Sequence, residues 1–312
     1  MSTPCQVPVV LLAHRRPDLT ALVMQRIREA RPARLLVSID GPRPNHPHDQ
    51  AAVAAVTRAA TAVDWPCDVS VRRGDSNLGC RWGPSEGLDW AFTVVDQAIV
   101  LEDDCVPDAS FFTFCAELLE RFADDSRVMG IGGHRNEGPD LADGPSYSFS
   151  RYTATWGWAT WANRWRDVDV AMSDWPQVRA TPWLSQQLSD PVAIAHWQRT
   201  FDAMTAGLDA WDYALQYTLW RQGSYWVRPT TNLVQNLGFG TGATHTLHVD
   251  PHGSRPAAAM TFPLRHPHVV AADPTLDARI EWITHSGLTT RRLREAARRI
   301  SSRRAQPQAA AT

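Results

Sequence analysis

The sequence predicts an α/β fold with a mostly parallel central sheet that is flanked by helices. Three observations support this fold class. Short runs of apolar residues alternate along the chain with longer stretches whose apolar residues recur at helical spacing. Most of the runs are nearly continuously apolar, which is typical of parallel strands buried on both faces of a sheet, whereas residues 67–72 alternate between apolar and polar. Several of the runs also end in polar or charged residues, as strands that lead to a binding site do.

The elements are expected in a regular order. The first strand covers residues 7–13, and a helical pattern through Leu19 and Ile27 follows it. The remaining elements, in order, are a strand at 34–40, an Ala-rich helix at 49–63, a strand at 67–72, a helix at 84–95, a strand at 98–101, a helix at 108–122 and a short strand at 128–133. The pattern predicts strand–helix units packed into one sheet.

The second half of the chain differs in composition. Ten of the fourteen Trp residues fall between Trp156 and Trp226, and no internal repeat is present. Beyond Pro251 the content of Pro, His and Ala suggests loose packing, and a basic helix is expected over residues 280–304.

The charge distribution argues against nucleic acid as a partner. The formal net charge is -2, but residues 289–312 contain seven Arg and one Glu, which is a local charge of +6, so the rest of the chain carries -8. A nucleic-acid binder needs a basic face to replace the counterions of the phosphates, and an acidic body does not offer one.

The five cysteines show neither a disulfide framework nor zinc-ribbon spacing. This usage fits a reducing compartment, so we expect a cytoplasmic protein. The first apolar run is a poor signal peptide because Pro8 interrupts it and no positive charge precedes it. No apolar run approaches the roughly 18 residues that a membrane span needs.

An acidic run stands where the fourth predicted strand ends. Glu102, Asp103 and Asp104 follow Leu101 directly. Carboxylates this close repel one another unless a cation shares the site, and hard divalent ions such as Mn²⁺ and Mg²⁺ prefer carboxylate and phosphate oxygens. The run therefore predicts a metal and a phosphate ligand. The alternative is a solvated acidic turn that caps the helix beginning near Asp108.

Several motifs in order resemble those of the GT-A glycosyltransferases, within them bacterial proteins similar to N-acetylglucosaminyltransferase I, which carry Glu-Asp-Asp in place of Asp-x-Asp. The resemblance covers residues 7–246. The motifs are Ala13-His14-Arg15-Arg16-Pro17, Ser38-Ile39-Asp40-Gly41-Pro42, Asn77-Leu78-Gly79, Val100-Leu101-Glu102-Asp103-Asp104 and Trp156-Gly157-Trp158-Ala159-Thr160-Trp161.

The resemblance implies a GT-A, Rossmann-like domain over residues 1–250, with a nucleotide-binding half at 1–130, a Trp-rich sugar and acceptor half at 131–250, and an extension at 251–312. It implies that Asp104 ligates the metal while Asp103 faces the ribose and donor sugar, and it leaves the role of Glu102 less defined.

The resemblance also assigns residues around the nucleotide. His14, Arg15 and Asp40 would flank the base and ribose, although Asp40 also suits a turn before Gly41. Arg81 could reach a phosphate or the ribose. The alternative is that it is a surface residue.

Direct displacement at a sugar carbon needs a base for the acceptor hydroxyl. Asp212 begins a helical pattern through Leu215 and Leu219, the place where inverting GT-A enzymes commonly carry the base, and Asp209 is the reserve candidate. Capping of the helix is the alternative role for Asp212.

Two further groups are candidates for the sugar and the metal. His245, in the glycine-rich segment 236–246, is placed to reach back to the metal or diphosphate, and packing is its alternative role. Trp158, with Trp156 and Trp161, is a candidate wall for a sugar, although large aromatic residues more commonly fill the core.

The basic segment at the end of the chain has two possible interpretations. A basic helix with some apolar residues can lie peripherally on the inner face of the membrane, where lipid-linked acceptors are found, or it can be a solvated terminus.

The sequence thus predicts a metal-dependent, inverting hexosyl- or N-acetylhexosaminyltransferase. It would transfer a sugar from a nucleotide-sugar donor, for which a UDP-sugar is the favoured candidate, to a hydroxyl group of an acceptor. The reaction would belong to bacterial glycan, polysaccharide or glycolipid synthesis. The alternatives are a sugar-phosphate nucleotidyltransferase and a noncatalytic sugar-binding protein with the same fold.

Overall fold

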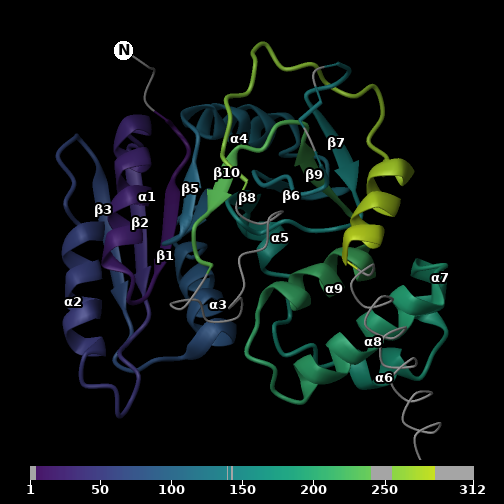
Figure 1. Cartoon of the computed structure of the whole chain (residues 1–312), viewed down its shortest axis with the longest axis horizontal. Helices are drawn as coiled ribbons and strands as arrows, with labels where there is room; N and C mark the ends of the chain where they lie inside the picture. Colours follow the sequence, from purple (N-terminus) through teal and green to yellow (C-terminus); the bar gives the residue numbers. More distant parts are fainter. Residues whose placement is uncertain (1–4, 139, 142, 240–254, 285–312) are drawn as a thin grey trace, which may run out of the picture.

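The computed structural model describes residues 5–138, 140–141, 143–239 and 255–284. Within them, eight strands form one mixed sheet. The strands are β1 (Val9–Ala13), β2 (Arg34–Ile39), β3 (Asp68–Arg73), β4 (Gln97–Glu102), β6 (Val128–Gly132), β7 (Tyr147–Ser150), β8 (Trp158–Trp161) and β9 (Tyr225–Pro229). Their order across the sheet is β3-β2-β1-β4-β8-β6-β9-β7 (Figure 1).

The sheet is mostly parallel, as the sequence predicts. β1 pairs in parallel with both β2 and β4, β2 with β3, and β6 with β9. β8 runs antiparallel between β4 and β6, and β7 runs antiparallel to β9 at the edge. A separate small sheet pairs β5 (Cys105–Pro107) with β10 (Val234–Asn236) in antiparallel fashion.

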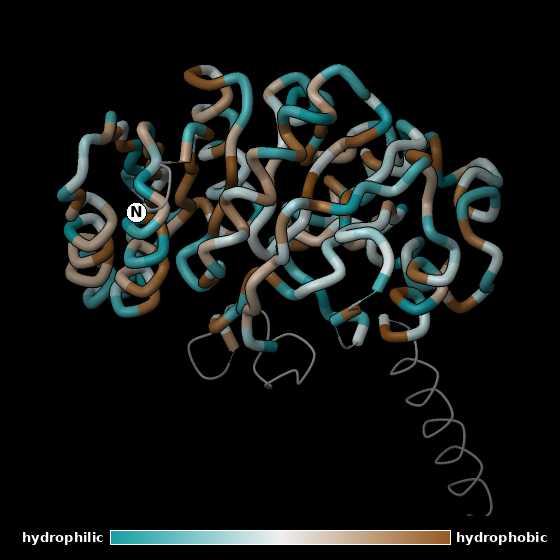
Figure 2. Tube along the Cα trace, turned by 90° about the horizontal axis from the view of Figure 1, so that it is seen from above, coloured by the Kyte–Doolittle hydropathy of each residue, from teal (hydrophilic) through white to brown (hydrophobic). Residues whose placement is uncertain are grey.

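Helices cover both faces of the sheet. In β1, Val9 and Leu11 belong to one hydrophobic cluster, whereas Val10 and Leu12 belong to another. The first cluster includes residues of α1 (Pro17–Ala30), α2 (Asp49–Ala60) and α4 (Ala109–Arg121), and the second includes residues of α3 (Gly79–Ala91) and of the Trp-rich half. The outer helices carry both brown and teal turns in Figure 2, as expected for helices with one face on the sheet.

The first half of the chain folds largely as predicted, apart from the bounds of α3 and the short strand β5, which the sequence did not predict. That helix begins at Gly79 rather than at Pro84, so Pro84 lies inside it. The reason is a remote partner: the carboxylate of Asp209 accepts a hydrogen bond from the backbone nitrogen of Arg81 at 2.7 Å. A cap supplied from so far along the chain leaves no local sequence signal.

The Trp-rich half contains elements that the sequence did not predict individually. β8 inserts between β4 and β6, so strands from the two predicted halves belong to one sheet. The helices of this half lie on the side of the molecule away from α1 and α2, with α5 near the middle of the view (Figure 1). They are α5 (Ala162–Trp165), α6 (Trp175–Arg179), α7 (Trp183–Gln187), α8 (Pro191–Thr205) and α9 (Asp212–Gln222).

The expectation of loose packing after Pro251 is wrong for residues 255–284. Met260, Leu264, Leu276 and Ile280 are buried. Residues 274–284 form a helix, drawn in yellow in Figure 1, beside β7. Apolar side chains in this segment bury against the body of the protein because both hydrophobic clusters extend to it.

Among the residues that the structure describes, no helix combines the length and apolar character that a membrane span requires.

Candidate functional site

A pocket of about 220 Å³ lies where β1, β2 and β4 end. We call it the carboxylate pocket, after Glu102 and Asp103 at its edge. His14 and Arg16 reach it from the end of β1, and Asp40 from the end of β2. These strands are parallel, so their carboxyl ends meet at one edge of the sheet, the usual place for a ligand in an open α/β fold.

Arg16 neutralises part of the acidic run. Its Nη2 lies 2.7 Å from Oδ1 of Asp103, and its Nη1 donates to Oδ2 of Asp104 at 2.6 Å. The backbone nitrogen of His14 donates to the other oxygen of Asp103 at 3.1 Å. Asp103 and Asp104 are only 2% and 6% exposed, so these bonds compensate carboxylates that have little contact with water.

The run still carries excess negative charge. Near pH 7 Glu102 is protonated, because its pKa is raised to about 8, so Asp103 and Asp104 bring two negative charges and Arg16 returns one positive charge, which leaves one. The pKa of Glu102 is raised by burial, then by repulsion from Asp104 and Asp103, and Asp212 adds to the effect. Burial also raises the pKa of Asp103, against the attraction of Arg16. This remaining charge and the oxygen ligands fit one divalent cation.

The structure does not show a preformed set of metal ligands among the described residues, so the predicted cation site stays a prediction. Within the described ranges, no group of three or more His, Cys, Asp or Glu side chains is arranged to hold a metal. In this arrangement the guanidinium of Arg16 takes the position of counterion to Asp104. His245 lies outside the described residues, as does the basic segment 289–312.

A short segment after β10 closes over Asp104. The backbone nitrogen of Leu237 donates to the carbonyl of Asp104 at 2.9 Å. A Cβ atom on Gly238 would lie 2.0 Å from Oδ2 of Asp104, so only glycine allows this approach. Next along the chain, the ring of Phe239 packs against Trp156, with centroids 5.6 Å apart. The segment therefore links the acidic run to the Trp-rich half.

Asp40 lines the carboxylate pocket but also orders the loop beside it. Its carboxylate accepts hydrogen bonds from the side chain of Asn77 at 2.6 Å and from the backbone of Leu78 at 2.9 Å and Gly79 at 3.2 Å. The turn role considered for Asp40 is thus present, and its contact with a base or ribose stays a prediction. Arg15 also lines the pocket.

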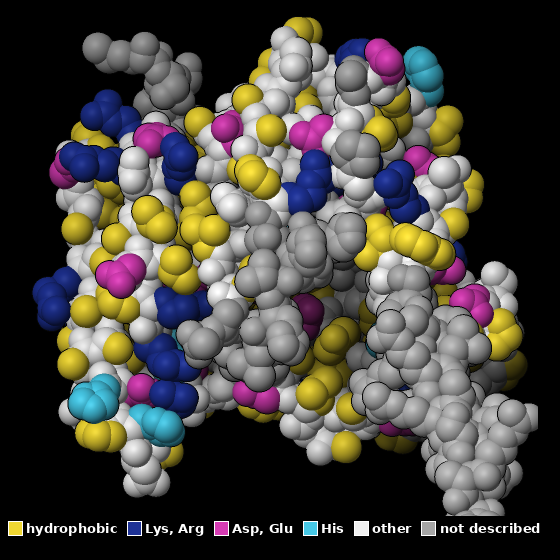
Figure 3. Space-filling view, viewed as in Figure 1, with side chains coloured by type: hydrophobic (Ala, Val, Ile, Leu, Met, Phe, Trp, Pro, Cys, Tyr) yellow, Lys and Arg dark blue, Asp and Glu magenta, His cyan; other side chains and the backbone are white. Residues whose placement is uncertain are grey.

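The surface beside this pocket is basic. Figure 3 shows Arg and His side chains gathered near the segment that follows β2. Arg43 there forms an ion pair with Asp49 at 2.6 Å and also lines the pocket.

The prediction for Arg81 is corrected by the structure. Arg81 is buried, and its guanidinium donates to the carbonyls of Met204 and Val170, both at 2.8 Å. It therefore ties α3 to the Trp-rich half and is neither a surface residue nor part of the lining of the carboxylate pocket. Two backbone acceptors explain how this charge is tolerated away from water.

The two candidate bases occupy different environments. Asp209 lines the carboxylate pocket, where its carboxylate holds the start of α3 through Arg81. Asp212, the first residue of α9, lines a second cavity of about 210 Å³. We call this cavity the tryptophan pocket and define it by His134, Trp156, Trp197, Asp212, Tyr213, Gln216 and Arg228, with Ile280 and Thr284 on another side.

The prediction for Trp158 is also corrected. Trp158 is 1% exposed and packs against Trp211 and Trp226, with centroids 5.7 Å and 5.5 Å away. Its ring fills the core, the commoner use of a large aromatic residue, and it lines neither pocket. Trp161 is likewise buried, whereas Trp156 is only partly buried and lines the tryptophan pocket.

Three site residues were not assigned from the sequence. Arg16 precedes Pro17 in the first motif, and its position after a strand was the available signal. His134 follows β6 in the same way. Arg228 lies inside β9, a strand that the sequence did not reveal, so no local pattern pointed to it.

Comparison by sequence matches no protein-family model and no curated protein. Among the solved structures to which the chain shows similarity are the following two. One is a galactosyltransferase, LgtC, in complex with donor and acceptor sugar analogs, with 14% identity over 90% of this chain and 95% of that one and a TM-score of 0.35. The other is a UDP-glucose pyrophosphorylase complexed with UDP-glucose, with 9% identity over 52% of this chain and 70% of that one and a TM-score of 0.28. Similarities this weak leave the function to be argued from the site itself.

Proposed function

We propose that this protein is a metal-dependent, inverting glycosyltransferase that moves a hexosyl or N-acetylhexosaminyl group from a nucleoside-diphosphate sugar, UDP-sugar favoured, to a hydroxyl acceptor. The observation that carries the proposal is the acidic run, which places three carboxylates against the single guanidinium of Arg16 at the edge of a pocket. A second pocket containing Asp212 lies beyond Asp209, three residues away in the sequence.

The donor is assigned to the carboxylate pocket. Asp104, with Asp103 beside it, would hold the divalent cation, Mn²⁺ or Mg²⁺. His14, Arg15 and Asp40 would face the base and ribose. Arg16, which already lies against the two aspartates, is positioned to pair with a donor phosphate.

The chemical step is a single displacement. The oxygen of the acceptor hydroxyl forms a bond to the anomeric carbon of the donor sugar, and the bond from that carbon to the diphosphate oxygen breaks. Asp212 takes the hydroxyl proton, and the nucleoside diphosphate leaves with the bonding electron pair. A bound divalent cation would neutralise charge on the leaving diphosphate. Attack from the side opposite the leaving group inverts the anomeric centre.

The proposal is tested by thermal unfolding with UDP, GDP and dTDP, each with and without Mn²⁺. We expect one nucleotide, UDP favoured, to raise the melting temperature only when Mn²⁺ is present, because a ligand that binds the folded state stabilises it. Asp104→Asn should abolish that dependence on metal. If no nucleotide stabilises the protein with or without Mn²⁺, the donor site is wrongly assigned.

Product analysis separates the enzyme classes. A glycosyltransferase incubated with a UDP-sugar releases UDP, whereas a nucleotidyltransferase running in reverse consumes pyrophosphate and releases UTP. A noncatalytic protein would bind the nucleotide-sugar and leave it intact.

A further inference from the structure

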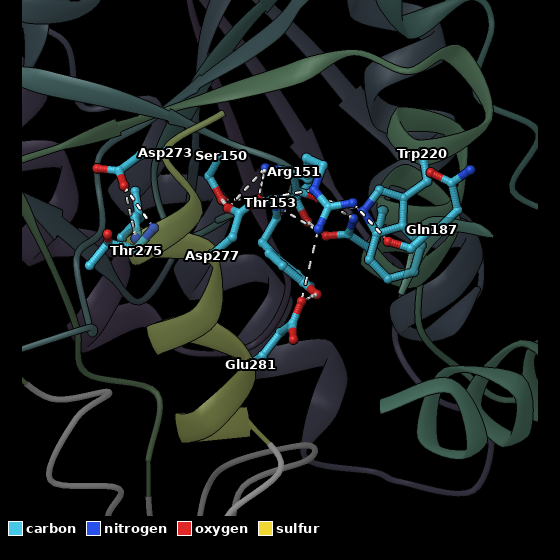
Figure 4. A network of polar contacts seen from close by, with 12 residues as sticks. Ser150, Arg151, Thr153, Gln187, Trp220, Asp273, Thr275, Asp277 and Glu281 are labelled. Carbon is cyan, nitrogen blue, oxygen red and sulfur yellow. Dashed lines mark hydrogen bonds and ion pairs between the residues drawn. The ribbon is translucent and has the colours of Figure 1, made fainter. Parts of the chain in front are cut away.

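The two edges of the main sheet differ. β7 forms one edge and β3 forms the other. The segment that leads into the helix at 274–284 covers the edge at β7, where the backbone nitrogen of Asp273 donates to the carbonyl of Phe149 at 2.8 Å. Ser150 donates to Oδ1 of Asp277 at 2.6 Å, and Figure 4 shows these two side chains turned toward one another. This edge is therefore closed by the chain itself.

The edge at β3 is open. The backbone nitrogen of Asp68 donates to the carbonyl of Ala33, and that of Gly74 donates to the carbonyl of Ile39, both at 2.9 Å. Because the backbone groups of a strand alternate between its two sides, the N–H and C=O groups of the odd-numbered residues from 69 to 73 point away from β2. No described residue forms a hydrogen bond with these groups. An unpaired edge of this kind is a template for another strand.

The sequence of β3 is complementary to itself. It begins Asp68-Val69-Ser70-Val71-Arg72. If the strand of a second copy ran antiparallel to it with the two Ser70 residues opposite one another, each Asp68 would lie opposite Arg72 and each Val69 opposite Val71. A two-fold axis through Ser70 would repeat every contact, as in most homodimers.

This register also uses the free backbone groups. Val69 and Val71 have their N–H and C=O groups on the open side, so as opposite residues they would exchange both hydrogen bonds. Asp68 and Arg72 would form the alternate kind of pair, in which the opposite side chains approach most closely. Opposite charges in this position stabilise a sheet, whereas like charges destabilise it.

The side chains that would meet are accessible. The side chain of Asp68 is 64% exposed and that of Arg72 is 22% exposed, on the face of the sheet that α3 covers. Val71, on the other face, is 37% exposed. Each charge also has a partner within the chain, since Arg72 pairs with Glu86 and Asp68 pairs with Arg34 at 3.2 Å. The charges would therefore alternate in sign across the interface.

The charges also select the register. Charged residues at the edge of a sheet commonly prevent association. Pairing centred on Arg72 would bring two guanidinium groups together, and pairing centred on Asp68 would bring two carboxylates together. The register centred on Ser70 sets each of these charges opposite a charge of the other sign.

We propose that β3 binds β3 of a second copy of this chain, antiparallel and centred on Ser70, so that two molecules form one continuous sheet. The partner is the chain itself because the strand complements itself in charge and in hydrogen bonding. The two strands run in opposite directions, so the carboxylate pockets of the two copies lie at opposite edges of the joined sheet. The proposal does not depend on the proposed function.

Self-association of the full chain is measured by sedimentation velocity over a range of protein concentrations. A single pair of strands is a small interface, so we expect dimers to form at roughly 10 to 100 µM. A chain that remains monomeric at about 1 mM overturns the proposal.

Charge reversal tests the register. Asp68→Arg alone sets arginines opposite one another and Arg72→Asp alone sets carboxylates opposite one another, so each variant should self-associate roughly ten-fold more weakly or worse. An equal mixture of the two variants should associate as the unmodified chain does, because every arginine then meets a carboxylate. Asp124→Arg, which reverses an exposed charge outside β3, is the control and should associate normally. Undiminished association of either single variant, or a mixture of folded variants that does not associate, overturns the proposal.

Hydrogen exchange of backbone amides tests the same strand without any substitution. Raising the concentration of the unmodified chain should slow exchange at Val69 and Val71, whose N–H groups face the open edge. Exchange at Ser70 and Arg72 should change little, because their N–H groups already face β2. If exchange at Val69 and Val71 does not depend on concentration while the chain dimerises, the interface lies elsewhere and the proposal is wrong.

Discussion

The carboxylate pocket includes Asp209 and the tryptophan pocket includes Asp212, three residues later in the chain, yet the chemistry of the two pockets differs. The first has three carboxylates, an arginine and the ends of parallel strands. The second has aromatic rings, one charge of each sign and a neutral histidine. An excess of charge suits a metal and a diphosphate, whereas a balanced and partly apolar lining suits a sugar ring.

The difference shows why two similar aspartates have different roles. Asp209 faces the charged pocket, and its oxygen holds the start of α3. Asp212 faces the neutral pocket, where a hydroxyl would lose its proton. The start of α9 thus separates a structural carboxylate from a candidate base.

The largest expected effect is on catalysis. Asp212→Asn keeps the shape of the side chain but removes the base, so transfer should fall by roughly 100- to 10,000-fold. UDP with Mn²⁺ should still raise the melting temperature. Asp209→Asn retains an acceptor for Arg81 and should lose much less activity. Equal losses in both variants would contradict the division of roles.

The next effect separates a core tryptophan from a pocket tryptophan. Trp158→Ala opens a cavity in the core and should lower the free energy of unfolding by about 3 to 5 kcal/mol, measured by urea denaturation. Trp156→Ala, at the partly buried position in the pocket of Asp212, should cost less stability and should lower the rate of sugar transfer. The comparison fails if Trp158→Ala leaves the free energy of unfolding unchanged and lowers the rate of transfer.

A smaller effect concerns the counterion of the acidic run. Arg16→Met leaves Asp103 and Asp104 without their ion pairs and should destabilise the protein by about 2 kcal/mol, because these two carboxylates are buried. Mn²⁺ alone should stabilise this variant more than the unmodified protein. Arg26→Met, which removes an exposed pair with Glu29, is the control and should show no such difference. An equal response to Mn²⁺ in all three proteins would exclude the acidic run as the metal site.

The smallest effect is expected at the cap of α3. Asp209→Ala removes the acceptor for the backbone nitrogen of Arg81 and should cost about 1 kcal/mol in thermal or urea unfolding. Stability equal to that of the unmodified protein would show that another group caps the helix.

The sequence predicted most of the first half of the fold because most of its strands are nearly continuous apolar runs with clear ends. It also placed the acidic run at the end of a strand and Asp212 at the start of a helix, where the structure has them, and their roles stay predictions. It did not locate β8, because no local pattern shows that residues 158–161 pair with β4 and β6, and Trp158 and Trp161 were interpreted as candidate binding residues instead. Arg81 was misassigned for a related reason: its two acceptors, Met204 and Val170, lie far along the chain.

The position of β8 has a consequence for synthesis of the protein on the ribosome. β4, which leads into the acidic run, pairs on one side with β1 and on the other with β8. Until residue 161 has emerged, one edge of β4 has no partner, and β6 cannot join the sheet because β8 lies between them. Open edges promote association between chains, so a fragment that ends near residue 130 should aggregate rather than fold as a unit.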